Sequence, residues 1–265
     1  MGFRYHWKLV QGLDNVAPYN LRILQFHRIP KNHFGPPPAG TDPWDYVITD
    51  AGRQGNKIQY AHTVLLDSVD LAILTPGDYN YWDGKLSEPW ELPKGAGLSV
   101  WLDDNTEAIV AVCEIIERCD IPKFTRFKTF QLKPNYATIL RFPGNTILKR
   151  LIFYDLFMFD TANKFWRPQR WTRDTLISPA ADNQWLSSKL TVIAQFGGKA
   201  PYELCRDIDH YLQVVSGADG RAHIIEADVP LAHNESVTVK LETSLSSTYL
   251  ERFQFLCIAE YKAVS

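Results

Sequence analysis

Ser236-Val237-Thr238-Val239-Lys240-Leu241-Glu242 alternates apolar and polar side chains, and the later run Phe253-Gln254-Phe255-Leu256-Cys257-Ile258-Ala259-Glu260-Tyr261 is almost continuously apolar. Alternation with a period of two is typical of a β-strand that has one buried face. A continuous apolar run predicts a strand that is covered on both faces. We therefore predict that the chain closes with a strand–turn–strand unit, a β-hairpin.

The same pattern occurs once before, in the stretch from about residue 98 to residue 115. Aligning the two stretches matches Leu98 with Val237, Leu102 with Leu241, Ile109 with Phe253 and Cys113 with Cys257. Only the connecting loop differs in length. The match predicts two consecutive units that end in the same way. The alternative is that two unrelated hairpins share a pattern by chance.

The composition is that of a folded globular protein. The chain has 265 residues, which suits one large or two medium domains. Hydrophobic residues make up 45% and charged residues 22%, which excludes a disordered chain. The net charge of −2 does not favour nucleic-acid binding. We find no signal peptide and no transmembrane segment, so we expect the protein to fold in a reducing cytosol.

The order of strand and turn patterns predicts two sandwich-like halves. We place the first β-sandwich at residues 1–120, with a Pro-rich loop at 29–43, and the second at residues 124–265. About fifteen runs have strand patterns. One short helix is predicted in the second half, at residues 201–215, from apolar residues at helical spacing after a proline. The predicted class is all-β.

Catalytic and metal-binding motifs are absent from the sequence, so we predict no enzyme, no cofactor and no metal site. The seven histidines form no H-x-H pair, and the four cysteines form no C-x-x-C pair. Cys113 and Cys257 are expected to be small buried hydrophobic residues. Asp207 and His210 would share a face of the predicted helix and could pair, but a solvated helix face is the favoured interpretation.

Two aromatic groups in predicted loops are the candidate contact residues. They are candidates for a subunit interface or for a ligand, because rings offer flat apolar faces and arginine binds anions. Packing under a long loop or at a subunit contact is the simpler interpretation of both. The first group is Tyr79, Tyr81 and Trp82, and the second is Trp166, Arg167, Arg170 and Trp171.

Several stretches of the second half resemble the double jelly-roll coat proteins of icosahedral, often membrane-containing, phages of the tectivirus and corticovirus type. They are Phe130-Gln131-Leu132, the run from Leu140-Arg141-Phe142 through Pro143-Gly144-Asn145-Thr146, Leu151-Ile152-Phe153-Tyr154, and the closing residues 237–261. The first half resembles this family only through its matching final pattern. The first half lacks a clean set of eight strands, and the family does not require the Pro-rich segment.

The resemblance implies two jelly rolls that stand upright in a shell, with three copies forming a pseudo-hexagonal capsomer. The implied function is a self-assembling capsid protein located in the virion. The implied partners are copies of the chain itself as a homotrimer, other virion proteins, and an internal membrane or genome, rather than a small molecule. The competing hypothesis is a carbohydrate- or receptor-binding β-sandwich, such as a phage decoration or spike protein or a lectin. A jelly-roll enzyme is a third.

Overall fold

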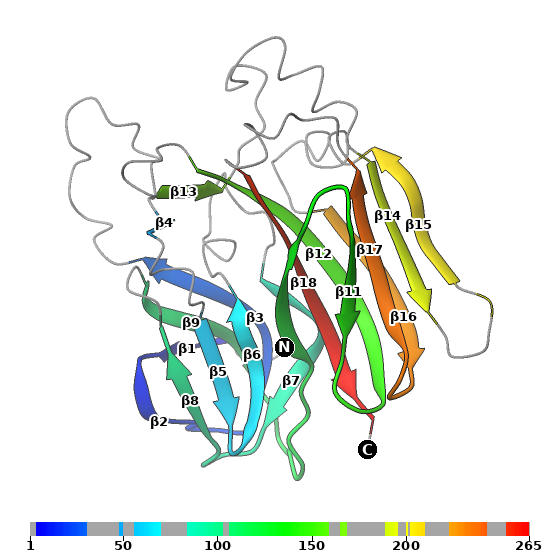
Figure 1. The fold of residues 1–265 in the computed structure, drawn as a ribbon. Coiled ribbons are helices and arrows are strands. Elements are labelled where there is room, and N and C mark those ends of the chain that lie inside the picture. The colour runs from blue at the N-terminus through cyan, green and yellow to red at the C-terminus, as the bar shows by residue number, and fades with distance from the viewer. Residues whose placement is uncertain are drawn as a thin grey trace, which may run out of the picture. The chain divides into compact units, whose positions relative to one another are not determined.

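The computed structural model describes residues 4–30, 48–49, 56–69, 84–102, 106–158, 165–168, 189–195, 200, 202–209, 223–242 and 253–264. Within these ranges all regular elements are β-strands, which confirms the all-β prediction (Figure 1). The chain divides into two compact units. Unit 1 comprises Met1–Gly77, Trp82–Lys128 and Met158–Arg167, and unit 2 comprises Asp78–Tyr81, Thr129–Phe157 and Pro168–Ser265.

Unit 1 contains two sheets of four strands each. The strands are β1 (Arg4–Leu9), β2 (Gly12–Val16), β3 (Leu21–Pro30), β5 (Asn56–Tyr60), β6 (Thr63–Val69), β7 (Lys85–Leu92), β8 (Gly97–Trp101) and β9 (Thr106–Ile115). One sheet has the order β1-β9-β3-β7 and the other the order β2-β8-β5-β6. Neighbours within these two rows of four are antiparallel, and β6 also pairs in parallel with Phe127 and Lys128, so the second row is part of a larger sheet. The short strand β4 (Ile48–Thr49) pairs with β13 (Phe165–Pro168).

Unit 2 also contains two sheets of four strands. The strands are β10 (Arg126–Leu132), β11 (Ala137–Arg141), β12 (Thr146–Met158), β14 (Lys189–Gln195), β15 (Tyr202–Asp209), β16 (His223–Leu231), β17 (Ser236–Glu242) and β18 (Phe253–Ala263). The first sheet has the order β10-β18-β12, with β16 on the other side of β12. The second has the order β11-β17-β14-β15.

The two units have the same topology. Leaving aside the short strands β4 and β13, the strand order by sequence rank is 1-8-3-6 in one sheet and 2-7-4-5 in the other, in both units. Two facing four-stranded sheets in which the first strand lies beside the last form a jelly roll. The chain is therefore a tandem of two jelly rolls, as predicted. That each of them folds as an independent domain stays a prediction.

The core of unit 2 lies between its two sheets. Cys257, Ala259 and Tyr261 of β18 belong to this core, and they face Val237, Val239 and Leu241 of the other sheet across a single hydrophobic cluster. The intervening residues Leu256, Ile258 and Glu260 are buried as well, although they point to the opposite face of β18. Strand β18 is therefore covered on both faces, as its continuous apolar run predicts.

The two closing strand pairs are not hairpins. Strand β8 pairs with β2 and β5, whereas β9 pairs with β1 and β3. Likewise β17 pairs with β11 and β14, and β18 pairs with β12. Each closing pair therefore spans the two facing sheets of its jelly roll. Alternation of side chains identifies a strand and its buried face, but it does not identify the strand's partner.

The predicted helix at residues 201–215 is wrong over its described part, because residues 202–209 form strand β15. Its partner β14 explains the error. Val192 lies opposite Cys205 and Leu190 lies opposite Ile208, so two residues of β14 span three residues of β15. Such a bulge brings residues three apart to the same side of a strand. That spacing resembles the helical period. Asp207 therefore lies on a strand and not on the predicted helix, and His210 lies outside the described residues.

The segment that joins the two units, residues 116–125, is packed against unit 1. Phe124 contacts the ring of Trp90 edge-on, with centroids 5.5 Å apart, and lies 5.2 Å from the ring of Tyr60. The indole Nε1 of Trp90 donates a buried hydrogen bond of 3.0 Å to the Thr125 hydroxyl. Lys123 exchanges two backbone hydrogen bonds with Glu91 of β7. The connector therefore contributes to the core of unit 1.

The turn between β5 and β6 contains a strained residue. Tyr60 pairs with Thr63, so the turn has only two residues, and Ala61 adopts a φ of 49°. A left-handed backbone costs an L-residue roughly 1–2 kcal/mol, whereas the added chain entropy of glycine costs roughly 0.5–1 kcal/mol. Ala61→Gly is therefore expected to raise the free energy of unfolding by about 0.5–1 kcal/mol in urea denaturation. His62→Gly is the matched control, because His62 has no positive φ, and it should lower stability instead.

Candidate functional site

The predicted contact residues fall mainly outside the described part of the chain. Tyr79, Tyr81 and Trp82 lie between β6 and β7, and Arg170 and Trp171 follow β13, all outside the described ranges. For Trp166 and Arg167 the structure describes the backbone, as part of strand β13, where Trp166 is paired with Ile48. Their role in an interface or in ligand binding stays a prediction.

The topology places the connections of each unit at two distinct ends. Successive strands alternate in direction, so the connections after β1, β3, β6 and β8 leave from one end of unit 1. The connections after β10, β12, β15 and β17 do the same in unit 2. We call this the long-connection end, because the longest intervals between main strands in the sequence, residues 31–55, 70–84, 159–188 and 210–222, begin after strands that finish there. In sequence, the first group of predicted contact residues follows β6 and the second follows β12, and both of these strands finish at a long-connection end.

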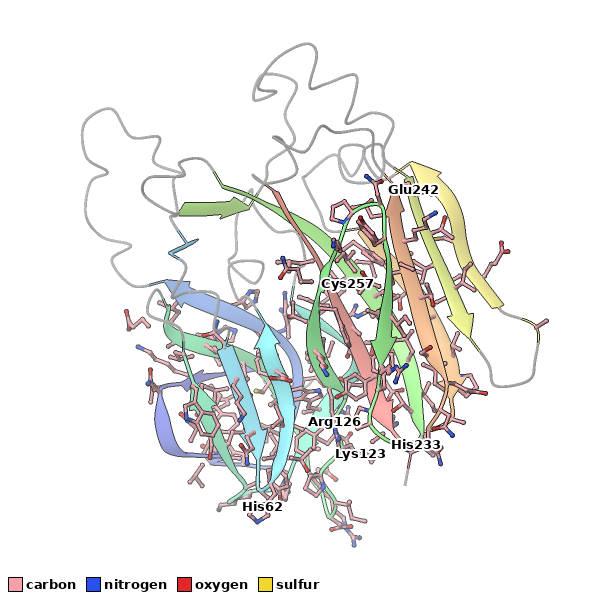
Figure 2. All side chains as sticks on the ribbon, in the orientation of Figure 1. His62, Lys123, Arg126, His233, Glu242 and Cys257 are labelled. Atoms are coloured by element: carbon pink, nitrogen blue, oxygen red, sulfur yellow. The ribbon has the colours of Figure 1, made fainter. Side chains whose placement is uncertain are left out.

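The opposite end of each unit, the short-turn end, is closed by tight turns. His62 and His233 lie in such turns, whereas Glu242 lies at the long-connection end of unit 2 (Figure 2). In unit 1 the Ala17 amide donates to the Ala96 carbonyl at 2.8 Å, and the Gly95 amide donates to the Ala17 carbonyl at 2.9 Å. Backbone groups here bond to one another, which leaves an end suited to a compact contact surface rather than to a reactive cleft.

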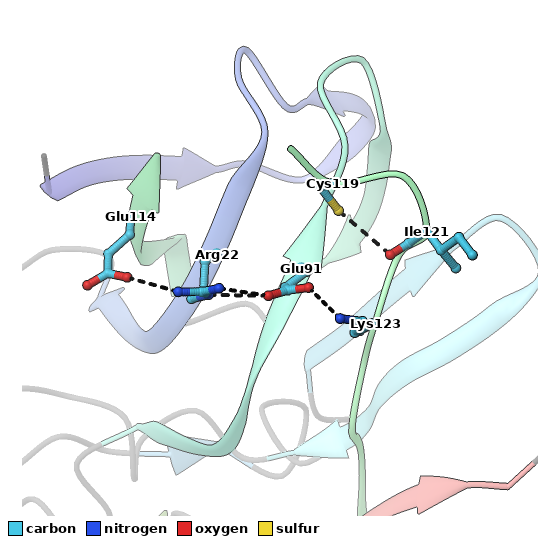
Figure 3. A network of polar contacts seen from close by, with 6 residues as sticks. All are labelled: Arg22, Glu91, Glu114, Cys119, Ile121 and Lys123. Carbon is cyan, nitrogen blue, oxygen red and sulfur yellow. Dashed lines mark hydrogen bonds and ion pairs between the residues drawn. The ribbon is translucent and has the colours of Figure 1, made fainter. Parts of the chain in front are cut away.

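A row of alternating charges crosses the outer face of the β1-β9-β3-β7 sheet (Figure 3). Arg22 of β3 lies between Glu91 of β7, at 3.1 Å, and Glu114 of β9, at 3.7 Å. Lys123 of the connector adds a second ion pair to Glu91, at 2.9 Å. The hydrogen bonds from Lys123 and then from Arg22 lower the pKa of Glu91. This row attaches the connector to the sheet by charge as well as by packing.

The lowered pKa of Glu91 predicts a pH dependence of stability. A carboxyl group whose pKa is lower in the folded state stabilises the fold above its unfolded pKa, and the effect disappears as the pH falls through the folded pKa. Because Arg22 and Lys123 are largely exposed, Glu91→Gln should cost only about 1 kcal/mol at neutral pH. Urea denaturation should show that the difference between the variant and the wild type shrinks as the pH falls below the ordinary carboxyl pKa and disappears in stronger acid. A difference that persists unchanged in acid would contradict an electrostatic origin.

A second row of the same kind occurs in unit 2. Arg150 of β12 lies opposite Glu226 of β16 and opposite Glu260 of β18. Its Nε donates to Glu260 Oε2 at 2.5 Å, and the side chains are only 7% and 0% exposed. In both jelly rolls the third strand thus carries an arginine between glutamates on the sixth and eighth strands. The residues of each row are far apart in sequence, so no local pattern could have revealed them.

The cysteines are free thiols in this structure. Burial raises the pKa of Cys113 to about 12 and that of Cys205 to about 11, and it raises the pKa of Cys257 further still. A thiol with a raised pKa is a poor nucleophile at neutral pH. The buried positions of Cys113 and Cys257 agree with the prediction that they are small core residues.

The described residues offer neither a cluster of metal ligands nor a membrane-spanning helix. Among the described residues no group of three or more His, Cys, Asp or Glu side chains is arranged to hold a metal ion. The same part of the chain contains no helix long and apolar enough to cross a membrane.

The fold defines the class of the protein, which is a double jelly roll. No protein-family model matches the sequence. No curated protein matches it either. Comparison with solved structures finds the STIV MCP, with 12% identity over 98% of this chain and 91% of that chain and a TM-score of 0.41. A chain from the atomic structure of Sulfolobus Turreted Icosahedral Virus has 10% identity over 99% and 88%, with a TM-score of 0.39. A chain of the T13 IBDV viral particle has 10% identity over 94% and 61%, with a TM-score of 0.20.

Proposed function

We propose that this chain is a self-assembling coat protein of an icosahedral virus particle. The observation that carries the proposal is the repeated topology of the two units, with identical strand order in both pairs of sheets. A chain with two similar units can build a ring of six similar units from three copies. Closed rings are the usual form of homo-oligomers built from heterologous contacts. The function is then geometric and needs no catalytic group.

The finer form of the proposal is a homotrimer that packs with its neighbours into a shell. Jelly rolls suit this role because their strands are short and their two sheets bury their inner faces against each other. This arrangement leaves the loops free for contacts. The connector leaves unit 1 at its short-turn end, where β9 finishes, and enters unit 2 at its short-turn end, where β10 begins. The strand ends that precede the long connections therefore lie at the opposite end of each unit. We propose that contacts with other virion proteins, and with an internal membrane or genome, are made at the long-connection ends and the short-turn ends of the two units.

Particle mass tests the proposal directly. Sedimentation velocity of the purified chain should show a species of three times 30.4 kDa, and electron microscopy should show larger closed particles as the concentration rises. A monomer under every condition, combined with a ligand found on a glycan array, would favour a carbohydrate- or receptor-binding protein instead. In that case Tyr81→Ala with Trp82→Ala should abolish glycan binding, whereas the coat proposal expects no glycan binding to lose.

A further inference from the structure

Two sheet edges of opposite charge remain open among the described strands. In the β1-β9-β3-β7 sheet, the β7 edge is covered by the connector through the backbone bridge between Glu91 and Lys123. Strand β1 is the other edge, and among the described strands it pairs only with β9. In unit 2, β16 is an edge that pairs only with β12 among the described strands. An open edge offers unpaired backbone groups to another chain.

The β1 edge is basic on its outer face. Arg4, His6 and Lys8 are exposed, whereas the alternate residues Trp7 and Leu9 are buried in the core. Lys8 forms an ion pair of 2.8 Å with Glu107, and both side chains are about half exposed. Such a surface pair contributes about 0–1 kcal/mol, so Lys8 can exchange its partner at little cost.

The β16 edge is acidic on its outer side. Glu226 and Asp228 are exposed, whereas Ile225 and Val229 are buried in the core of unit 2. Asp228 is 70% exposed and pairs with Lys149. Glu226 lies opposite Arg150, whose guanidinium binds the buried Glu260. Both carboxylates are therefore accessible to a cationic partner.

We propose that the β1 edge of one copy of this chain docks against the β16 edge of a second copy. The inference rests on the proposed coat function and specifies which surfaces meet. A contact between two different edges is heterologous, so each copy would use both edges, and three copies would close a ring. Complementary charges select the partner and fix the register of such a contact more than they add affinity.

Strand directions are compatible with this contact. Strand β1 starts at the short-turn end of unit 1, and β16 finishes at the short-turn end of unit 2. If neighbouring copies place their short-turn ends on the same side of the shell, the two strands are antiparallel. Arg4 and Asp228 would then both lie in the half of the contact that is nearer the short-turn ends. Antiparallel edges can also exchange backbone hydrogen bonds.

Charge reversal tests the contact in the full chain. Arg4→Glu with Lys8→Glu should abolish the trimer and the particles, and so should Glu226→Lys with Asp228→Lys. The chain that carries all four substitutions should regain assembly, because the charges are again complementary. Lys57→Glu with Lys240→Glu is the matched control, since these cations lie on the inner strands β5 and β17 and not on an edge strand or in a turn, and it should assemble like the wild type. Sedimentation velocity and electron microscopy give the readout, with circular dichroism to confirm folding.

The outcomes separate this inference from the proposed function. If the wild type assembles and both pairs of reversals assemble equally well, the edge contact is wrong and the coat function stands. If the wild type never assembles, the coat function itself fails. If a reversed chain does not fold, Glu226→Gln with Asp228→Asn replaces it. This neutral pair should reduce assembly and weaken its dependence on salt, and unchanged assembly at low salt would overturn the contact.

Discussion

Glu260→Gln is expected to lower the free energy of unfolding by about 3–5 kcal/mol, because it removes the negative charge that Arg150 binds in a buried site. The pair is bonded at 2.5 Å and is almost completely shielded from water. Removing one partner of such a pair exposes the full cost of desolvating the other. Urea denaturation followed by far-ultraviolet circular dichroism measures the change.

The chain supplies its own control for this prediction. Glu114→Gln breaks the corresponding pair in unit 1, where Arg22 is 41% and Glu114 36% exposed. That change should cost less than about 1 kcal/mol. Replacing both buried partners, with Arg150→Met and Glu260→Leu, should recover most of the loss. A Glu260→Gln variant as stable as Glu114→Gln would show that Arg150 reaches water in solution.

Trp90→Ala should lower the stability of unit 1 by about 3–5 kcal/mol, because it opens a cavity at the centre of an aromatic cluster. Trp90 is fully buried, and its ring centroid lies 5.0 Å from that of Phe26 and 6.3 Å from that of Phe127. The variant also removes the hydrogen-bond donor to Thr125 and the ring that Phe124 contacts. The connector should therefore loosen, and trypsin should cleave faster after Arg118 and Lys123.

Two milder variants separate cavity formation from hydrogen bonding at this site. Trp90→Phe keeps an aromatic ring and should lose less than the alanine variant. Thr125→Val removes the acceptor of the 3.0 Å bond while the Trp90 ring stays in place, and it should cost about 1–3 kcal/mol. If Trp90→Ala changes neither stability nor the cleavage of the connector, the packing of residues 123–127 on unit 1 is wrong.

The sequence predicted the parts of the fold that depend on local periodicity. The closing runs at 98–115 and 236–261 predicted strands, because alternation and continuous apolar runs report burial directly. The similarity of the two runs predicted the repeated unit. The helix at 201–215 failed, since the bulge in β15 imitates a helical spacing. Partner strands could not be predicted, because side-chain alternation is the same in a hairpin and in strands of facing sheets.

The candidate surfaces were less predictable than the fold. The prediction from aromatic content singled out residues 79–82 and 166–171, most of which lie outside the described residues. The charge rows around Arg22 and Arg150 arise from strands that are distant in sequence. Single charged residues on a strand look alike whether they face water or a partner, so only the register between strands shows the pairing.

The position of the short-turn ends has a mechanical consequence. Each jelly roll begins and ends at that end, and its first and last strands are neighbours in one sheet, as with β1 and β9 or β10 and β18. Tension along the chain therefore separates these strands from one end, one pair of hydrogen bonds after another, rather than shearing all of them at once. Single-molecule pulling on the termini should give low unfolding forces. If copies assemble as proposed, tension along the chain would then have to be borne by lateral contacts between copies and not by the strand pairs within one chain.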